Sequence, residues 1–561
     1  DAQTGKERTV ISNSDGGFTV PLLDVGKYTV KVSSKGFKST TTTVTIQIAQ
    51  EYSLSVQLSV GDVSENVTVT GGADIVNSTN GELSSTLTNR QITELPLATR
   101  NPLALILTQA GSASNPSQNT SIDGGRTSST NITRDGVNIQ DNFIRSNATD
   151  FSPGRPSVDN VEEFTLTAQS AVDAGFGSAQ VNFVTPRGGN QFHGAGWEYN
   201  RNSAVGANSW FANAGGNYLA TDKAVVNGFR QAGEEISPRP FRNRNQYGVK
   251  VSGPIIKDKL FFFAYGEKLN DIVTASRVQT VLTASARTGI FQYVDAGGIT
   301  RSVNIFTPGA FTANPATGNA APTSINSLVN STYLTGMRDG NSFEAGDGLN
   351  TTGVRFFQNA NQTRDSLTSR LDYDLNSKNN INGVIDYNFE HNLRNDIDLF
   401  NPVPDVTQPA RNVLYSGGWR YSPTANISNE FRIGRIYSKP DFFRTDAAKS
   451  EYYQPILISS PEPQNGGVFR NQGRAVKTVN AQDTVSWLVG NHSLRFGVQF
   501  QRVAISAYND AGNLPAYNFG FSANGPIFSA ATLGAAGGAP LSSSQQTSAK
   551  NLYALLGGLI S

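Results

Sequence analysis

The chain has 561 residues, with 45 Lys and Arg against 44 Asp and Glu, so its formal net charge is +1. This balance lacks the clustered basic surplus that nucleic-acid-binding proteins need. The absence of Cys excludes a disulfide scaffold, a Cys-ligated zinc site, an iron–sulfur cluster and thiol catalysis. Three scattered His also argue against a His-rich metal site.

The sequence contains no apolar run of the roughly 18 to 20 residues that a transmembrane helix needs. The longest, residues 260–265, reads Leu-Phe-Phe-Phe-Ala-Tyr. The chain begins on Asp1 within a pattern and ends after an apolar segment, residues 551–560. We therefore expect a fragment truncated at both ends, with residues 550–561 as one more strand cut short. A missing signal peptide is then no evidence for a cytoplasmic location.

Residues 1–60 show short alternating segments separated by turns. Tyr28 and Val30 alternate with Lys27 and Thr29, and further strands are expected over residues 43–48 and 52–58. The pattern predicts a small antiparallel β-sandwich. It resembles the carboxypeptidase-regulatory-like β-sandwich without its first strands. The alternative is another immunoglobulin-like spacer module.

Residues 61–190 combine an extended segment, a short helix and several strands. Residues 62–72 are β-type and end in a Gly pair. Asn101 can cap a helix over residues 101–108, with Pro102 at its first position. Strands are expected over residues 161–166 and 181–185, which makes this a small α+β unit.

Residues 191–561 contain four pairs of alternating segments around short turns. In the last segment Leu494, Phe496, Val498 and Phe500 share one face. Such strands of about ten residues, apolar on one face, are typical of a transmembrane antiparallel β-barrel, whereas strands of soluble sandwiches usually have five or six. The predicted pairs are 246–256 with 260–268, 366–375 with 381–390, 413–421 with 427–437, and 477–487 with 493–501.

Long polar stretches separate these pairs, so short and long connections alternate as they do in outer-membrane barrels. With residues 190–201 as an opening strand, we expect nine or ten strands. This is about half of a plugged 22-stranded transporter. The expected long loops are residues 202–242, 271–362, 392–410, 439–473 and 507–550.

Seven short motifs follow one another within about 95 residues, from Leu95-Pro-Leu97 through Asp123-Gly-Gly-Arg126 to Asn182-Phe-Val-Thr185. This series resembles the plug of TonB-dependent outer-membrane receptors, and is most similar to the Oar-like branch. Phe176 and Pro186-Arg187 depart modestly from that pattern. The resemblance implies a β-sandwich at 1–60, a linker at 61–80, a plug at 81–190 and the first part of the barrel at 191–561. The motif residues are Arg100, Asp123, Gly124, Arg126, Asp135, Gly136, Glu162, Gly175, Gly177 and Asn182, after Leu95-Pro-Leu97.

The resemblance also assigns the candidate TonB box to Val67, Thr68, Val69 and Thr70. Such a box pairs by its edge with a periplasmic energy-coupling protein of the TonB type, which requires an extended, accessible segment. The alternative is the last strand of the sandwich or a plain linker. The resemblance further implies a Gram-negative outer-membrane location, contact with lipid, and an unidentified extracellular ligand that is imported.

No residue pattern indicates catalysis, a cofactor or a metal. His193 has no second ligand at zinc spacing. Residues 372–376 mimic an EF-hand start but fail at Ser377 and Gly383, so they are expected in a lumen-facing strand. We expect Arg126 and Asp135 to be buried in the plug as an ion pair or to line the ligand path. The rival functions are a cell-surface adhesin or structural β-protein without transport, and a secreted β-rich hydrolase.

Overall fold

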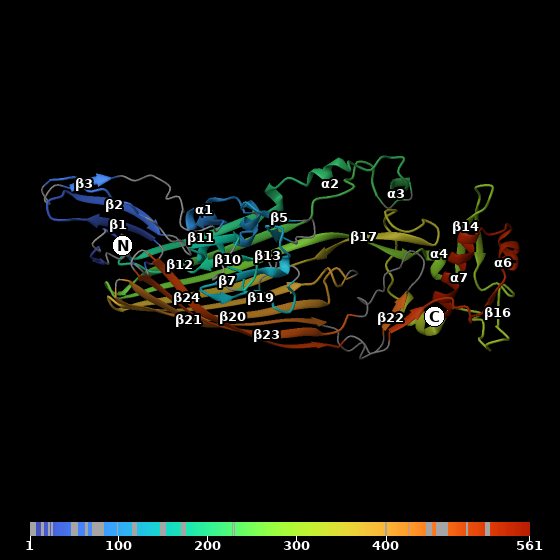
Figure 1. The fold of residues 1–561 in the computed structure, drawn as a ribbon. Coiled ribbons are helices and arrows are strands. Elements are labelled where there is room, and N and C mark those ends of the chain that lie inside the picture. Colours follow the sequence, from blue (N-terminus) through green and yellow to red (C-terminus); the bar gives the residue numbers. More distant parts are fainter. Residues whose placement is uncertain are drawn as a thin grey trace.

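The computed structural model is mostly β (Figure 1). It describes the chain except residues 1–6, 13–15, 19, 21–22, 24–25, 47–53, 62–65, 70–82, 98, 115–119, 146–152, 170–175, 227, 229, 399–400, 425, 445–451, 456–468, 490–491, 511–515 and 561.

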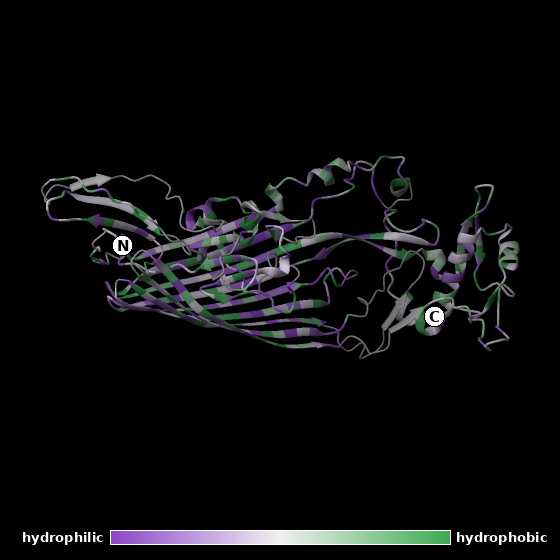
Figure 2. Ribbon diagram, in the orientation of Figure 1, coloured by the Kyte–Doolittle hydropathy of each residue, from purple (hydrophilic) through white to green (hydrophobic). Residues whose placement is uncertain are grey.

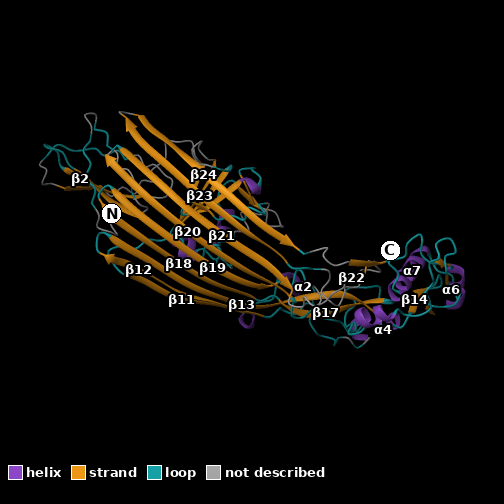
Figure 3. Cartoon of the chain, turned by 90° about the horizontal axis from the view of Figure 1, so that it is seen from below, coloured by secondary structure: helices purple, strands orange, loops and turns teal. Residues whose placement is uncertain are grey.

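A curved antiparallel sheet of ten strands dominates the fold (Figure 3). Every predicted hairpin and the predicted opening strand are confirmed, although most strands are longer than predicted because they continue past the apolar stretch. The strand order is β11 (His193–Asn202), β12 (Arg242–Ile256), β13 (Leu260–Leu282), β18 (Gln362–Asn376), β19 (Asn379–Leu393), β20 (Val406–Thr424), β21 (Ile427–Arg444), β23 (Gln472–Val489) and β24 (His492–Asn509), and β17 (Thr351–Asn359) pairs with the outer part of β13.

The two faces of this sheet have the polarity of a membrane barrel. On the outer face Phe496 and Val498 are 55% and 68% exposed. On the inner face Asn382, Asp386 and Glu390 are buried, and hydropathy alternates along the strands (Figure 2). Apolar side chains outside and polar ones inside invert the arrangement of a soluble protein and are typical of a transmembrane β-barrel. Among the helices within the described ranges, none is long and apolar enough to cross a membrane.

A plug lies against the inner face of the large sheet. Its apolar core includes Ile132, Phe164 and Phe183, and Val384, Leu414 and Ile436 of the wall join the same core. Its sheet has the order β4 (Leu83–Thr88), β9 (Glu163–Gln169), β10 (Ala179–Val184), β7 (Thr130–Arg134) and β8 (Val137–Asn138); around it lie α1 (Asn89–Glu94), β5 (Ser112–Ser114), β6 (Thr120–Ile122) and the 3₁₀ helices η1 (Pro102–Thr108), η2 (Thr127–Ser129) and η3 (Val158–Asn160).

The predicted helix of residues 101–108 is confirmed in the form of η1. The Asn101 side chain accepts a hydrogen bond from the Leu103 amide, and Pro102 begins the helix. This is the capping expected from the sequence, because proline at the first turn has no amide to satisfy.

The N-terminal region forms one three-stranded sheet of β1 (Gly26–Val32), β2 (Ser39–Ile46) and β3 (Asn66–Val69). The alternation around Tyr28 is confirmed by its half-buried side chain. Within the described residues, the predicted second sheet of the sandwich is not formed. The strand predicted over 52–58 is wrong for residues 54–58, which are in no strand. Pairing with the neighbouring segment occurs just after them, in the Phe37–Val60 bridge and in hydrogen bonds from Lys38 to the Ser59 carbonyl and from Gly61 to the Gly36 carbonyl.

Two of the expected long loops instead build a folded module with its own apolar core. Phe291, Tyr293 and Leu533 are among the buried residues. The module contains α4 (Ala284–Arg287), β14 (Ile290–Val294), β15 (Thr300–Asn304), β16 (Phe311–Thr312), α5 (Ser327–Val329), the π-helix η5 (Asn330–Leu334), β25 (Ala516–Phe519), β26 (Ile527–Phe528), α6 (Ala530–Gly537) and α7 (Ser543–Gly557). The remaining short elements are η4 (Ser203–Val205), α2 (Trp210–Ala214), α3 (Lys223–Val226) and β22 (Tyr452–Pro455).

The strand expected over residues 550–561 is wrong, because α7 runs through most of this segment. Ser542 and Gln545 form a capping box, and Gly558 ends the helix in the left-handed conformation at φ +72°. Ala549, Leu552, Tyr553 and Leu556 are fully buried at helical spacing. Residues 551–560 alone, without the cap at Ser542, fit either a helix or a strand, because a short apolar segment does not distinguish the two.

The N-terminal region and the loop module lie at opposite ends of the large sheet (Figure 1). A guanidinium nitrogen of Arg8 lies 3.4 Å from the Ser377 carbonyl in the short β18–β19 turn. The long β13 strand instead leads into the module. Short turns are periplasmic in outer-membrane barrels. The N-terminal sheet lies at the end of the large sheet that carries the short turns, and the module lies at the opposite end.

Candidate functional site

Arg134, at the end of β7, ties the plug to the barrel wall. It is fully buried, and its Nη1 lies 2.9 Å from Asp386 Oδ1 on β19. Its Nε donates to Thr185 Oγ1 and its Nη2 to the Asn160 carbonyl. Thr368 Oγ1 donates to the same Asp386 oxygen over 2.6 Å. All three nitrogens of the Arg134 guanidinium therefore make hydrogen bonds, and because the group is planar these bonds determine both the position and the orientation of the plug against the wall.

The neighbouring Asp135-Gly136 turn makes a second contact with the wall. Both residues adopt the left-handed conformation, with φ +47° and +80°. The Asp135 carboxylate accepts hydrogen bonds from the Thr185 amide and hydroxyl. Its backbone carbonyl accepts one from Ser416 Oγ on β20 over 2.7 Å. Arg370 of β18 lies 3.9 Å from the carboxylate.

The burial predicted for Arg126 is wrong. Its side chain is exposed, because the chain leaves the Gly124-Gly125 turn and uses residue 126 to begin η2. Asp135 is buried as expected, but its cationic neighbours are Arg134 and Arg370. The predicted ion pair between Arg126 and Asp135 is therefore absent.

Two further charged contacts join plug and wall. Arg474 of β23 binds Asp141 of the plug, and both side chains are buried. On the other side, Lys250 of β12 lies 3.5 Å from Asp159 of the plug. Arg100, which pairs with the same Asp159 within the plug at 2.5 Å, stacks its guanidinium 3.6 Å from the ring centroid of Tyr199 on β11. Arg100 itself has φ +53°, a conformation that costs energy for a non-glycine residue. The wall thus holds charged plug residues from both sides.

The remaining plug motif residues have mainly local structural roles. Gly177 has φ +96°, and a Cβ there would lie 2.4 Å from the Ser129 carbonyl oxygen, so only glycine fits. Asp123-Gly124 forms an exposed left-handed turn. The Asn182 side chain accepts a hydrogen bond from Thr133 over 2.6 Å. Gly175 lies outside the described residues.

Glu162 lies at the edge of β9, where its amide donates to the Val184 carbonyl. Burial raises the pKa of its carboxyl, and the positive charges of Lys250 and Arg370 oppose this shift. The next residue, Glu163, is in the strand and is buried. Glu162 therefore helps place the plug beside positively charged wall residues.

The candidate TonB box coincides with β3. Val67, Thr68 and Val69 pair in parallel with Thr40, Thr41 and Thr42 of β2. Thr70 lies outside the described residues. This is the arrangement expected from the alternative, a last strand of the N-terminal domain, and the box assignment stays a prediction.

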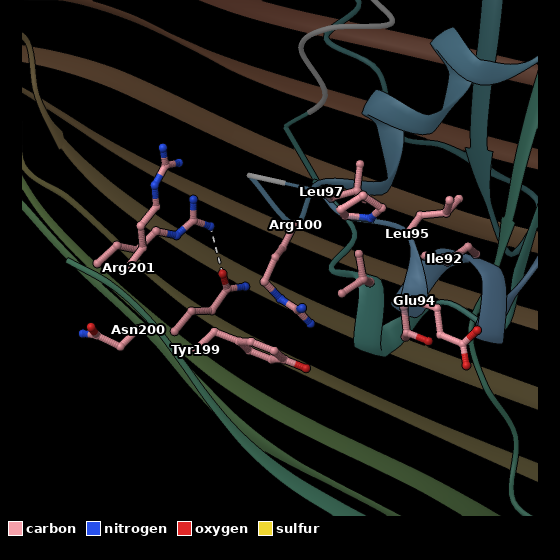
Figure 4. A pocket seen from close by; sticks show the side chains of 13 residues that line it. Ile92, Glu94, Leu95, Leu97, Arg100, Tyr199, Asn200 and Arg201 are labelled. Carbon is pink, nitrogen blue, oxygen red and sulfur yellow. Dashed lines mark hydrogen bonds between the residues drawn. The ribbon is translucent and has the colours of Figure 1, made fainter. Parts of the chain in front are cut away.

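A cavity of about 300 Å³ lies between plug and wall (Figure 4). On the plug side it is lined by α1, by the Leu95-Pro-Leu97 segment and by Arg100. On the wall side it is lined by residues 199–201 of β11 and by Arg244 and Gln246 of β12. Leu95-Pro-Leu97, predicted only as a plug motif, thus forms part of a concave site.

Within the described ranges, no group of three or more His, Asp or Glu is placed to hold a metal ion. His193 begins β11 and its side chain is exposed. Asp372 is buried on the inner face and paired with Arg370, as expected for a lumen-facing strand.

Sequence reasoning missed the wall residues of the interface, Asp386, Arg370 and Arg474. The available signal was a set of charged residues on the polar face of predicted barrel strands. That signal does not say which of them meet the plug, because the partners are hundreds of residues apart.

Comparison with known proteins agrees with this architecture. Residues 184–555 match the family model described as an outer membrane beta barrel domain, and residues 1–59 match the carboxypeptidase regulatory-like domain. A curated relative, the TonB-dependent transporter Oar of Myxococcus xanthus, is 26% identical over 272 residues, which is 46% of this chain and 23% of the relative.

Solved structures similar to this chain include the outer membrane transporter YddB from Escherichia coli, at 13% identity and TM-score 0.47. They also include a mutant of the ferric enterobactin receptor PfeA from Pseudomonas aeruginosa, at 12% identity and TM-score 0.41. The alignments cover 78% and 75% of this chain, and 50% and 49% of those chains. The chain thus spans about a quarter of the curated relative's length and half of these structures. The sheet has the inverted polarity of a membrane protein, and the family model matches residues 184–555. The chain therefore belongs to the outer membrane β-barrel domain family and resides in the Gram-negative outer membrane.

Proposed function

We propose that this chain is part of a TonB-dependent transporter that binds an extracellular ligand and imports it by displacing the plug. The observation that carries the proposal is a plug with its own sheet, held on the inner face of a membrane sheet by buried polar contacts such as Arg134–Asp386. Such polar contacts can exchange with water when the plug moves, whereas the apolar contacts of Val384, Leu414 and Ile436 with the plug core cost free energy to expose.

The energy for displacement comes from the inner membrane, through a periplasmic protein of the TonB type that pairs with residues 67–70. A β-branched segment suits this role, because strand addition depends on main-chain hydrogen bonds. β3 is the edge strand of its three-stranded sheet, in the order β1-β2-β3, and an edge is where a further strand can be added. Chemistry on the ligand is not required, so the protein acts without a catalytic residue, and the domain boundaries at 60, 80 and 190 mark the moving parts.

The direct test measures binding of a purified periplasmic TonB domain to the full-length protein by biolayer interferometry. Val69→Pro removes a main-chain N–H donor and introduces a ring that does not fit within a paired β-strand. The affinity of the TonB domain for this variant should therefore fall at least tenfold. Val69→Ile keeps the backbone and should leave affinity unchanged. Equal binding by both variants and by a protein lacking residues 67–70 would show that the box lies elsewhere.

The same deletion separates transport from adhesion. A transporter lacking residues 67–70 should still fold and bind at the cell surface while its plug no longer responds to the proton-motive force. A surface adhesin would behave identically with and without the segment.

A further inference from the structure

The cavity between plug and wall is lined by an excess of positive charge. Arg100, Arg201 and Arg244 all contribute to its lining. Glu94 is the one acid among the described lining residues, and it is already paired with Arg90 at 2.9 Å. Asp159, next to the cavity, is shared between Arg100 at 2.5 Å and Lys250 at 3.5 Å. Arg244 has Asp271 and Glu267 as acidic neighbours. The cation of this lining without a described carboxylate partner is therefore Arg201.

Several hydrogen-bond donors at this cavity have no acceptor. Gln246 is fully buried, and its Nε2 has no hydrogen-bond partner among the described residues, although its Oε1 accepts from Arg244 over 2.8 Å. Arg100 Nε is likewise buried without a partner for that atom. Arg201, which is exposed, makes no ion pair with any described carboxylate. Buried donors without acceptors cost free energy, and an anionic oxygen would remove this cost.

The rest of the lining is apolar or aromatic. Ile92, Leu95 and Leu97 line the plug side, and the Tyr199 ring lies on the wall side beneath the Arg100 guanidinium (Figure 4). A volume of about 300 Å³ is at the lower end of the range for small-molecule sites. Such a lining fits a small ligand with one charged end and one apolar body.

We propose that this cavity binds a small organic carboxylate, with its carboxylate held by the Arg201 and Arg100 guanidinium groups and the Gln246 amide, and its apolar body packed on Leu95, Leu97 and Tyr199. Guanidinium groups recognise carboxylates through paired, charge-assisted hydrogen bonds. The proposal deepens the proposed import function, because it names the ligand class at the contact that the plug would break.

The test is isothermal titration of the purified, detergent-solubilised protein with two probes of the same shape, benzoate and its neutral analogue benzamide. We expect benzoate to bind and benzamide to bind at least tenfold more weakly. Arg201→Gln and Gln246→Met should each lower benzoate affinity about tenfold, as expected for loss of one charge-assisted hydrogen bond. Arg201 is exposed, so its substitution should not disturb folding.

Arg411→Gln is the matched control, since Arg411 is exposed on β20 and does not line the cavity. Its benzoate affinity should equal that of the unmodified protein. Equal binding of benzoate and benzamide, no benzoate binding, or unchanged affinity in both cavity variants would overturn the proposal. Because the measurement uses no TonB protein and no energy source, its failure is distinct from a failure of the import function.

Discussion

Asp386→Asn removes the charge that holds Arg134 in the barrel wall while keeping the size of the side chain. Breaking one side of a buried ion pair costs about 3 to 5 kcal/mol. The lower end applies here, because an amide oxygen can still accept from Arg134, and the Asp135 carboxylate remains 4.0 Å from Arg134 Nε. A loss of about 3 kcal/mol raises the population of an undocked plug roughly 100-fold.

Hydrogen exchange measures this population. The Asn138 amide, which donates across the interface to Asn480 Oδ1 over 3.2 Å, should exchange about 100-fold faster in Asp386→Asn, whereas the amides of β7 (Thr130–Arg134) pair within the plug sheet and should change less. The amides of β19, in the wall, should change far less. Arg134→Met combined with Asp386→Leu should be less destabilising than the single change, because no unpaired buried charge is left.

Asp365→Asn provides the matched control. Asp365 pairs with Lys268 at 3.3 Å, but both side chains are about half exposed. An exposed pair contributes about 0.5 kcal/mol at most, so plug exchange should be unchanged. Equal exchange in Asp386→Asn and Asp365→Asn would refute the claim that the buried pair holds the plug.

Three further predictions concern other parts of the chain. Gly177→Ala should destabilise the plug by about 2 kcal/mol or more in thermal unfolding, because its Cβ would strike the Ser129 carbonyl, whereas Gly124→Ala in open space should cost about 1 kcal/mol. Phe496→Arg should reduce the membrane-inserted fraction in a folding assay, at a cost of about 2 to 4 kcal/mol on the lipid face, and unchanged insertion would contradict that placement. Burial raises the pKa of Tyr553 above its ordinary value of about 10. The contribution of this hydroxyl to the stability of the loop module should therefore be fully present below pH 10 and be lost as the pH rises further. In thermal melts Tyr553→Phe should remove this fall in melting temperature above pH 10, and the same fall in the variant would contradict the prediction.

The barrel strands were predictable because their signal is local. Ile381 and Ile385 face outward and Asn382 and Asp386 inward, as the period of two requires. The short turns between these segments determine how the two strands of each hairpin pair, so the hairpins could be predicted from the sequence. The ends of the strands were not predictable, since β13 continues to Leu282, well beyond the apolar stretch at its start.

The loop module and its helix α7 could not be predicted in the same way. Its core joins residues before Phe356 to residues after Phe519, and this pairing is invisible in a local pattern. Residues 551–560 alone resemble a strand, and only the Ser542 cap upstream decides for helix. Two of the five expected long loops, residues 271–362 and 507–550, were wrong for the same reason, because they form this module.

At the site, motif resemblance located the plug turns but not the charges that hold them. Asp135 was expected to pair with Arg126, which lies nine residues before it in the chain and is exposed. Its actual neighbours are Arg134, adjacent in sequence, and Arg370, on a wall strand. Long-range contacts of this kind are set by the docking of one unit on another.

The measurement that tests plug displacement most directly is labelling of a buried plug cysteine in living cells. Asn138→Cys suits this purpose, because the chain has no Cys and Asn138 is 1% exposed against the wall. A membrane-impermeant maleimide should label this variant of the full-length protein faster in energised cells than after addition of a protonophore. Deletion of residues 67–70 should abolish the difference. Equal labelling in all three conditions would contradict an energy-driven plug.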